Sequence, residues 1–244
     1  MEIRTWATGT PKIGTLLSID HPAVIEVARL AGFDWLWIDG EHGSFNEVSA
    51  ATACAITAEG PPTLVRLPDR SPTAIKRFLD IGCDGIILPQ VSTVTELDEI
   101  ARAALYPPLG ERSIGLTRAH GYGLRFADYL SRKSYAVVIQ IESVAGVANA
   151  AALIEHSVVD AVIIGPFDLS SSFGIPGLVD SPQVEEAIDS VLKLCKRAGK
   201  PCGIFAATAE KARAYAQMQF DLIAVGIDSR TLLDSFIALR NCLG

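Results

Sequence analysis

The sequence predicts a single domain folded as an α/β protein of the (β/α)8 TIM barrel type, on three observations. Eight short apolar runs rich in valine and isoleucine alternate with eight amphipathic stretches along the chain. At about 30 residues for each strand–helix unit, eight units account for the 244 residues. No low-complexity segment or long linker divides the chain, so we expect residues 1–244 to form one domain.

The eight predicted strands are nearly continuous apolar runs, as is typical of parallel strands that are covered on both faces. In chain order they comprise residues 13–19, 35–39, 63–67, 85–90, 136–142, 161–165, 202–206 and 222–227.

A helix-like segment follows each predicted strand. These segments comprise residues 23–31, 46–58, 72–81, 95–104, 144–156, 182–198, 209–218 and 230–243. Three of them are followed by a glycine, Gly32, Gly82 or Gly199, which favours the left-handed cap that turns the chain into the next strand. A doubly wound open sheet is the alternative, but it usually carries a glycine-rich phosphate turn. No GxGxxG or Walker-type sequence follows any predicted strand, so the closed barrel is favoured.

The composition indicates that the binding partners of this protein are small molecules. The net charge is −7 with scattered acidic residues, which excludes the basic surface of a nucleic-acid-binding protein and a polybasic membrane patch. There is no secretory signal and no apolar run of the ~18 residues that a membrane span needs. The cysteines form no CxxC pair and lie among apolar residues, which predicts buried, reduced thiols in a cytoplasmic protein.

Polar residues gather where the predicted strands end, which is where barrels of this kind place their active sites. Charged and amide groups are costly to bury there unless they serve one another or a ligand. The strand ends carry Asp39-Gly40-Glu41-His42-Gly43, Arg66, Gln140-Ile141-Glu142, Gly165-Pro166-Phe167-Asp168-Leu169-Ser170 and Asp228.

Glu142 and Asp168 end adjacent strands, and two such carboxylates repel each other unless a cation lies between them. A set of oxygen ligands predicts a divalent metal, Mg²⁺ or Mn²⁺, with Co²⁺ or Zn²⁺ as weaker candidates. The alternative is a carboxylate pair that shares a proton or forms an ion pair with Arg66.

His42 follows two acids in a glycine-flanked turn, and beside a metal pair it is a candidate for proton transfer, with Asp39 orienting its ring. Arg66 needs an anionic partner, either a substrate carboxylate or enolate, or alternatively Asp39, Glu41 or Asp80. Gln140 faces the same way as Glu142 and can hydrogen-bond a metal-bound water or a keto oxygen.

The seven lysines lie on predicted helices or before predicted strands, and none lies at a strand's C-terminal end. A Schiff-base enzyme on this fold requires a lysine at that end. The sequence therefore favours metal-stabilised carbanion chemistry.

A set of motifs in the right order over nearly the whole chain resembles the HpcH/HpaI family of class II, metal-dependent pyruvate aldolases, of the 4-hydroxy-2-oxoheptanedioate aldolase kind. The family has barrels of the phosphoenolpyruvate/pyruvate-superfamily type. The motifs are Phe33-Asp34-Trp35, Ile38-Asp39-Gly40-Glu41-His42, Leu64-Val65-Arg66, Leu79-Asp80-Ile81-Gly82, Tyr106-Pro107-Pro108-Leu109-Gly110-Glu111-Arg112, Gln140-Ile141-Glu142-Ser143, Ile164-Gly165-Pro166-Phe167-Asp168-Leu169-Ser170 and Ala224-Val225-Gly226-Ile227-Asp228.

The resemblance implies a role for each matching residue. Glu142 and Asp168 would hold the metal, which chelates a 2-oxo acid such as pyruvate, and the main-chain amides around Phe167 and Asp168 would hold the substrate carboxylate. Arg66 would stabilise the enolate, and His42, oriented by Asp39, would transfer a proton at the aldol oxygen. The supporting residues would be Glu41, Gln140 and Asp80.

The implied reaction cleaves or forms a C–C bond of a 4-hydroxy-2-oxo acid, giving pyruvate, or a related 2-oxo acid, and an aldehyde. The resemblance also implies a hexamer, a trimer of dimers, in which the last helix, about 230–243, is exchanged between neighbours. The apolar stripe of that helix is equally consistent with packing on its own barrel.

Two features depart from the family's best-known aldolases. One is the loop of residues 113–123, and the other is Phe205, which stands where a smaller aliphatic residue often lies against the substrate. Two alternatives therefore stay open. The first is a citrate-type synthase or decarboxylase with the same metal–enolate centre, in which Arg118 or Arg125 binds an extra carboxylate. The second is a non-catalytic metal-binding barrel.

Overall fold

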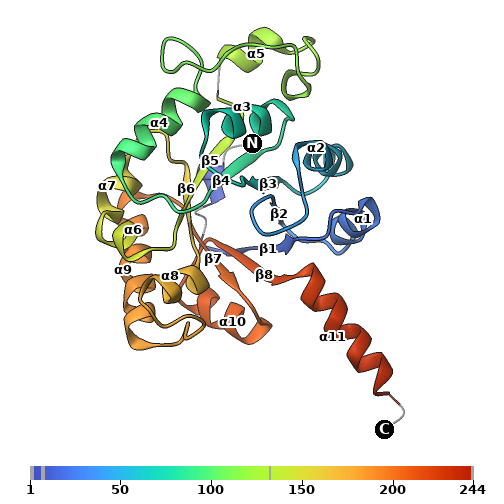
Figure 1. The fold of residues 1–244 in the computed structure, drawn as a ribbon, viewed down its shortest axis with the longest axis vertical. Coiled ribbons are helices and arrows are strands. Elements are labelled where there is room, and N and C mark those ends of the chain that lie inside the picture. The colour runs from blue at the N-terminus through green and yellow to red at the C-terminus, as the bar shows by residue number, and fades with distance from the viewer. Residues whose placement is uncertain (1–2, 7–8, 132, 243–244) are drawn as a thin grey trace.

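The computed structural model describes residues 3–6, 9–131 and 133–242 and forms a closed barrel of eight parallel strands in the order β1 to β8 (Figure 1). The strands are β1 (Lys12–Leu17), β2 (Trp35–Asp39), β3 (Thr63–Arg66), β4 (Gly85–Leu88), β5 (Ala136–Ile141), β6 (Ala161–Ile164), β7 (Cys202–Ala206) and β8 (Leu222–Ile227). All eight predicted strands are confirmed, with ends that differ by two residues at most.

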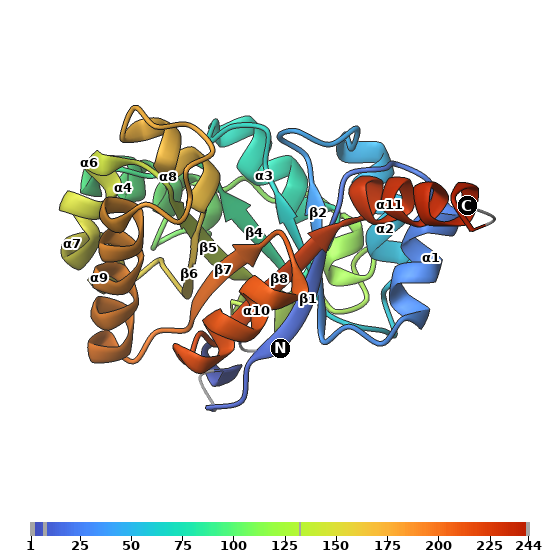
Figure 2. The ribbon, with the colours of Figure 1, turned by 90° about the horizontal axis from the view of Figure 1, so that it is seen from below.

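Helices surround the strands, as the view from below shows (Figure 2). They are α1 (Pro22–Leu30), α2 (Glu47–Ile56), α3 (Pro72–Asp80), α4 (Val94–Ala104), α5 (Phe126–Ser131), α6 (Val144–Ala148), α7 (Ala150–Glu155), α8 (Pro166–Ser172), α9 (Pro182–Ala198), α10 (Ala209–Gln217) and α11 (Asp228–Arg240), with 3-10 turns η1 (Ile3–Trp6) and η2 (Arg118–His120). Within the described part of the chain, no helix combines the length and apolar character that crossing a bilayer requires.

Four helical segments differ from prediction, and one of them is α5, which was not predicted. The segment 144–156 is two helices, because Asn149 leaves helical geometry between them, and its side-chain amide donates to Ser92 O at 2.8 Å. The helix α8 was not predicted, since its proline and serines gave no apolar period. The last helix starts earlier than predicted, at Asp228, and ends at Arg240 among the described residues, whereas the predicted end at residue 243 lies outside them.

The barrel encloses its own apolar core. Trp35 and Trp37 of β2 point inward and stack with their ring centroids 6.3 Å apart. A Cβ on Gly14 of the neighbouring strand would lie 2.4 Å from the Trp35 ring, so only glycine makes room for that indole. Because side chains fill the interior, ligands meet this barrel at its ends.

A second, larger core lies between the strands and the surrounding helices. The glycines predicted to end helices have the expected left-handed backbone, with φ of +81° at Gly32, +74° at Gly82 and +63° at Gly199. Four of the five cysteines are buried, as predicted, and Cys242 is exposed.

The helix α11 does not contribute to either core. It has no buried residue, and it projects from the barrel beyond β8 (Figures 1 and 2). Its apolar side chains remain exposed, namely Leu232, Leu233, Phe236, Ile237 and Leu239.

Candidate active site

Polar residues predicted at the strand ends meet at one mouth of the barrel. The register pairs Asp39, the last residue of β2, with Arg66, the last residue of β3. Glu142 directly follows β5, and Gly165 directly follows β6. Because all the strands are parallel, their C-terminal ends share one face, and these side chains converge there.

Arg66 is held by two carboxylates and an aromatic ring. Its Nε and Nη2 each donate to the Asp39 carboxylate at 2.8 Å, and Nη1 lies 2.9 Å from Oε2 of Glu41. The Trp37 ring lies 5.2 Å from the guanidinium carbon. Burial alone would lower the pKa of Arg66, but the hydrogen bond and charge of Asp39, followed by the charge of Glu41, raise it. The guanidinium is therefore charged and fixed, and two of its five N–H donors remain for a ligand.

The predicted ion-pair partners of Arg66 are thus confirmed for Asp39 and Glu41. Asp39 is 1% exposed, and its Oδ1 also accepts the backbone N–H groups of Glu41 at 3.1 Å and His42 at 3.3 Å. Asp39 therefore positions the backbone of the turn that carries His42, rather than the ring, whose closest carboxylate is that of Glu41.

His42 is the most exposed of the candidate catalytic side chains, at 67%. Its Nε2 lies 3.9 Å from Oε2 of Glu41. Burial raises the pKa of Glu41 and outweighs the opposing charges of Arg66 and His42. Glu41 thus stands between a fixed cation and an imidazole with room to move, which suits proton transfer at the mouth.

Glu142 occupies a buried cradle and is 3% exposed. Its Oε1 accepts the backbone N–H of Gln90 at 2.7 Å, and its Oε2 accepts the Gln140 side-chain amide. A Cβ on Gly165 would lie 2.6 Å from Oε2, so the close approach of β6 to this carboxylate requires glycine. Burial first, and then the charge of Asp168, raise the pKa of Glu142 to about 8.

Asp168 lies in the first turn of α8, exposed at the mouth, and its charge acts on both Glu142 and Glu41. Beside it, the half-exposed Phe167 ring packs against Phe205 at the end of β7, with centroids 6.2 Å apart. The two rings form an apolar wall next to the acidic pair.

The donors at the mouth fit a hard divalent cation. Among the described residues there is no cluster of three or more histidine, cysteine, aspartate or glutamate side chains arranged around one metal position. Mg²⁺ usually takes one or two carboxylates and keeps several waters, so Glu142 and Asp168 meet that need. The buried Oε1 of Gln140 has no hydrogen-bond partner, which leaves an oxygen acceptor for water or ligand beside Glu142.

Asp80 is the predicted site residue that the structure separates from the others. It is the last residue of α3, which runs back from the mouth, and its Oδ1 accepts Arg112 Nη2 at 2.6 Å. Arg112 in turn lies 5.5 Å from the ring of Tyr135, which directly precedes β5. Asp80 therefore lies at the opposite end of the barrel from the mouth of its own chain.

Asp228 also lies at a strand end, but its carboxylate is fully engaged. It accepts the N–H groups of Ser18 and Ile19 at 2.8 and 2.9 Å, which ties β8 to the loop after β1. Of the histidines set aside in the sequence, His21 caps α1 through its Nδ1, and His120 is buried within its own loop.

Sequence reasoning missed two groups that touch the site. Trp37 contacts Arg66 from below, and the two-residue period from Asp39 places it on the same inner side of β2. Gln90 contributes only its backbone N–H, for which the sequence carries no signal.

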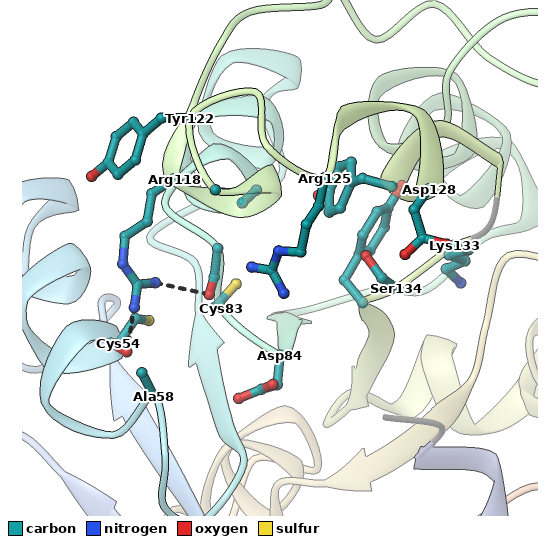
Figure 3. Close-up of a pocket in the computed structure, with 15 residues that line it drawn as sticks. Cys54, Ala58, Cys83, Asp84, Arg118, Tyr122, Arg125, Asp128, Lys133 and Ser134 are labelled. Carbon is teal, nitrogen blue, oxygen red and sulfur yellow. Dashed lines mark hydrogen bonds between the residues drawn. The ribbon is translucent and has the colours of Figure 1, made fainter.

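A hollow of about 630 Å³ lies away from this mouth (Figure 3). It is bordered by Asp84 and Tyr135, which directly precede β4 and β5, so it lies at the N-terminal end of the barrel. Arg118 donates to the carbonyls of the 81–82 turn and of Cys54, and Arg125 points into the hollow. Both arginines that were considered for an extra carboxylate site, Arg118 and Arg125, therefore lie away from the mouth of their own chain.

A family model described as HpcH/HpaI aldolase/citrate lyase matches residues 12–235. The chain belongs to the HpcH/HpaI aldolase/citrate lyase family.

Relatives within the HpcH/HpaI family carry named activities. A hydroxypyruvate/pyruvate aldolase of Chromohalobacter salexigens is 39% identical over 208 residues, which cover 83% of this chain and 82% of that protein. A 5-keto-4-deoxy-D-glucarate aldolase of Salmonella paratyphi A is 36% identical over 222 residues, which cover 89% and 86%.

The fold agrees with a solved member of the HpcH/HpaI family. A family protein of Burkholderia cenocepacia J2315 superposes with a TM-score of 0.94 at 31% identity, covering 99% of this chain and 98% of that one. The predicted barrel, family and enzyme class, a carbon–carbon lyase, are thereby confirmed.

Proposed function

We propose that this protein is a class II, divalent-metal-dependent pyruvate aldolase. It cleaves the C–C bond of a 4-hydroxy-2-oxo acid to give pyruvate, or a related 2-oxo acid, and an aldehyde. In the reverse direction it forms this bond from the same two compounds. One observation carries the proposal. The buried Glu142 carboxylate, whose pKa is raised by burial and by Asp168, lies at the same barrel mouth as the charged Arg66.

Glu142 and Asp168 would hold the cation, with Mg²⁺ or Mn²⁺ ahead of Co²⁺ and Zn²⁺ because both ligands are carboxylates. A bound divalent cation would polarise the substrate carbonyl and lower the cost of removing the adjacent proton. Gln140 keeps Glu142 in place and offers its free Oε1 to water or substrate.

The other residues bind the 2-oxo acid and move protons. The amides of Phe167 and Asp168 start α8 and lack helical acceptors, so they are available to the substrate carboxylate. Arg66 has two free N–H donors, which would stabilise the oxygen that becomes negative as the enolate forms. Because Asp39 and Glu41 already fix the guanidinium, this stabilisation requires little reorganisation.

His42 would transfer the proton at the aldol oxygen, since its exposed ring stands at the entrance and Glu41 lies within 3.9 Å. The Phe167–Phe205 wall would exclude water on one side of the bound 2-oxo acid and contact its apolar end.

Exchange of the pyruvate methyl protons with deuterated water tests the proposal, because exchange requires enolisation but no aldehyde. We expect exchange that depends on added metal and that is lost in Glu142→Ala and Arg66→Ala. His42→Ala should impair aldol cleavage more than exchange, and Asp189→Asn, on the outer surface of α9, should leave both unchanged.

Two results would overturn the proposal: full exchange after exhaustive chelation, or full metal-dependent activity in Glu142→Ala. Complete absence of exchange in the metal-loaded protein would instead favour a non-catalytic barrel.

The proposed working form is a cytoplasmic hexamer, a trimer of dimers, with α11 exchanged between neighbours. An amphipathic helix with no buried residue needs a partner surface, and the stripe from Leu232 to Leu239 supplies the apolar face. The four buried free thiols suit a reducing compartment. Light scattering in solution measures the mass directly, and a monomer would contradict the assembly.

A further inference from the structure

The turn after β4 presents its backbone to the candidate metal site in a conformation that needs support. Gln90 has φ of +55°, in the left-handed region that residues other than glycine seldom adopt. Its N–H donates to Glu142 Oε1 at 2.7 Å. Strained backbone of this kind persists only where surrounding groups hold it.

Arg70, from the connection between β3 and α3, holds that turn. Its Nη1 donates to Pro89 O and Gln90 O, both at 2.8 Å, and its Nη2 donates to Glu96 Oε1 at 2.8 Å. One planar guanidinium therefore joins the carbonyls on either side of the Gln90 N–H to the first turn of α4.

Glu96 completes the clamp from the other side. Its second oxygen, Oε2, accepts the N–H groups of Ser92 at 2.8 Å and Thr93 at 3.0 Å. The turn is thus fixed before Gln90 by Arg70 and after it by Glu96, and the two side chains fix each other.

We propose that Arg70, anchored by Glu96, is a positioning residue that aims the Gln90 N–H at Glu142 and so presets this carboxylate for a divalent cation. The inference rests on the proposed role of Glu142 as a metal ligand. Glu142 accepts two hydrogen bonds, from Gln140 and from Gln90, and Arg70 secures the second. Groups that orient a metal ligand are commonly worth 10- to 100-fold in metal affinity.

Binding of Mn²⁺ to the metal-free full-length protein, measured by titration calorimetry without substrate, tests the clamp. We expect Arg70→Met to weaken Mn²⁺ binding about tenfold, while kcat at saturating Mn²⁺ changes little. Arg70→Lys keeps the charge but lacks the planar fork, so it should weaken binding by a smaller factor. If Arg70→Met fails to fold, Arg70→Lys carries the test.

A second substitution separates this positioning role from a general loss of stability. Glycine adopts positive φ without strain, so adding Gln90→Gly to Arg70→Met should recover part of the Mn²⁺ affinity. The matched control is Arg77→Met, an exposed arginine on α3 that pairs with Glu47, and it should bind Mn²⁺ like wild type.

The outcomes distinguish the two proposals. Wild-type Mn²⁺ affinity in both Arg70 variants, with binding lost in Glu142→Gln, would overturn the clamp and leave the metal site standing. Absence of Mn²⁺ binding in the wild-type protein would overturn both.

Discussion

The two ends of the barrel each bury an arginine against carboxylate and aromatic side chains, but they differ in charge balance. At the mouth, Arg66 faces Asp39 and Glu41, and the carboxylates of Glu142 and Asp168 lie close enough to act on the same cluster. Four carboxylates share one guanidinium there.

The cluster around Arg112 at the opposite end is balanced in charge. Arg112 pairs with Asp80 at 2.6 Å, and the rings of Tyr106, Tyr129 and Tyr135 lie 4.7, 5.9 and 5.5 Å from its guanidinium. The Arg112 cluster pairs one carboxylate with one arginine, and aromatic rings supply the rest of its environment.

We infer that an uneven count of charges, rather than burial of an arginine, distinguishes the mouth as the candidate active site. Removing several carboxylates from water is unfavourable unless a cation offsets them. We therefore propose that the mouth takes a ligand of positive charge, whereas the charge of Arg112 is paired with Asp80 and stabilises the fold.

Substituting each arginine by lysine should give the largest contrast between the two ends. Arg66→Lys keeps the charge but loses the fork to Asp39 and Glu41, so we expect kcat for pyruvate proton exchange to fall about 10²-fold. Arg112→Lys should leave exchange per folded molecule unchanged and cost about 1.5–3 kcal/mol of unfolding free energy, the scale of a charged hydrogen bond.

Kinetics and urea denaturation of both variants measure these effects. Equal losses of exchange in the two variants would show that the ends do not divide function from stability in this way.

The sequence was sufficient for the barrel and for most of the mouth, because both depend on regular patterns. The apolar runs and the glycines that follow helices predicted the eight strand–helix units. Asp39, Arg66 and Glu142 converge because each lies at the C-terminal end of a parallel strand. Asp80 was assigned from a motif, and its position in the fold is not at the mouth of its own chain. Its place at the end of a helix that runs back from the mouth puts it at the other end.

Other features depend on geometry that no residue pattern records. Gln90 acts through its backbone N–H, and Arg70 acts on carbonyl groups, so neither has a sequence signal. The stripe on α11 shows that the helix needs an apolar partner but does not identify it, and the structure shows that its own barrel does not bury it.

The pH dependence of metal binding tests the excess of carboxylates at the mouth. The pKa of Glu142 rises from 4.5 to about 8 on folding of the metal-free protein, so the folded state binds more protons than the unfolded state between these values. The metal-free protein should therefore lose stability as pH rises from about 4.5 to 8, with no further loss from this group above 8.

In the same range a metal must displace the Glu142 proton, so Mn²⁺ affinity should increase up to about pH 8, with release of close to one proton per ion near neutral pH. Titration calorimetry in two buffers of different ionisation enthalpy measures the number of protons released, because the observed binding enthalpy differs between the buffers by that number times the difference in ionisation enthalpy. Glu142→Gln should abolish the pH dependence of stability between these values and lose Mn²⁺ binding altogether, and a pH-independent affinity in the wild type would contradict the raised pKa.

The smallest expected effect concerns the ring beneath Arg66. Trp37→Phe keeps most of the packing but weakens the contact with the guanidinium, and such contacts are worth about 0.5–2 kcal/mol. We expect kcat for exchange to fall about threefold with Mn²⁺ affinity unchanged. Trp35→Phe is the matched control, since Trp35 stacks on Trp37 and donates to Lys12 O at 3.1 Å. It should lower the melting temperature without changing kcat. Both indoles lie in the same buried stack. A fall in kcat in Trp37→Phe alone would therefore follow from the position of Trp37 under Arg66. Equal falls in kcat in both variants would show that the effect comes from core packing.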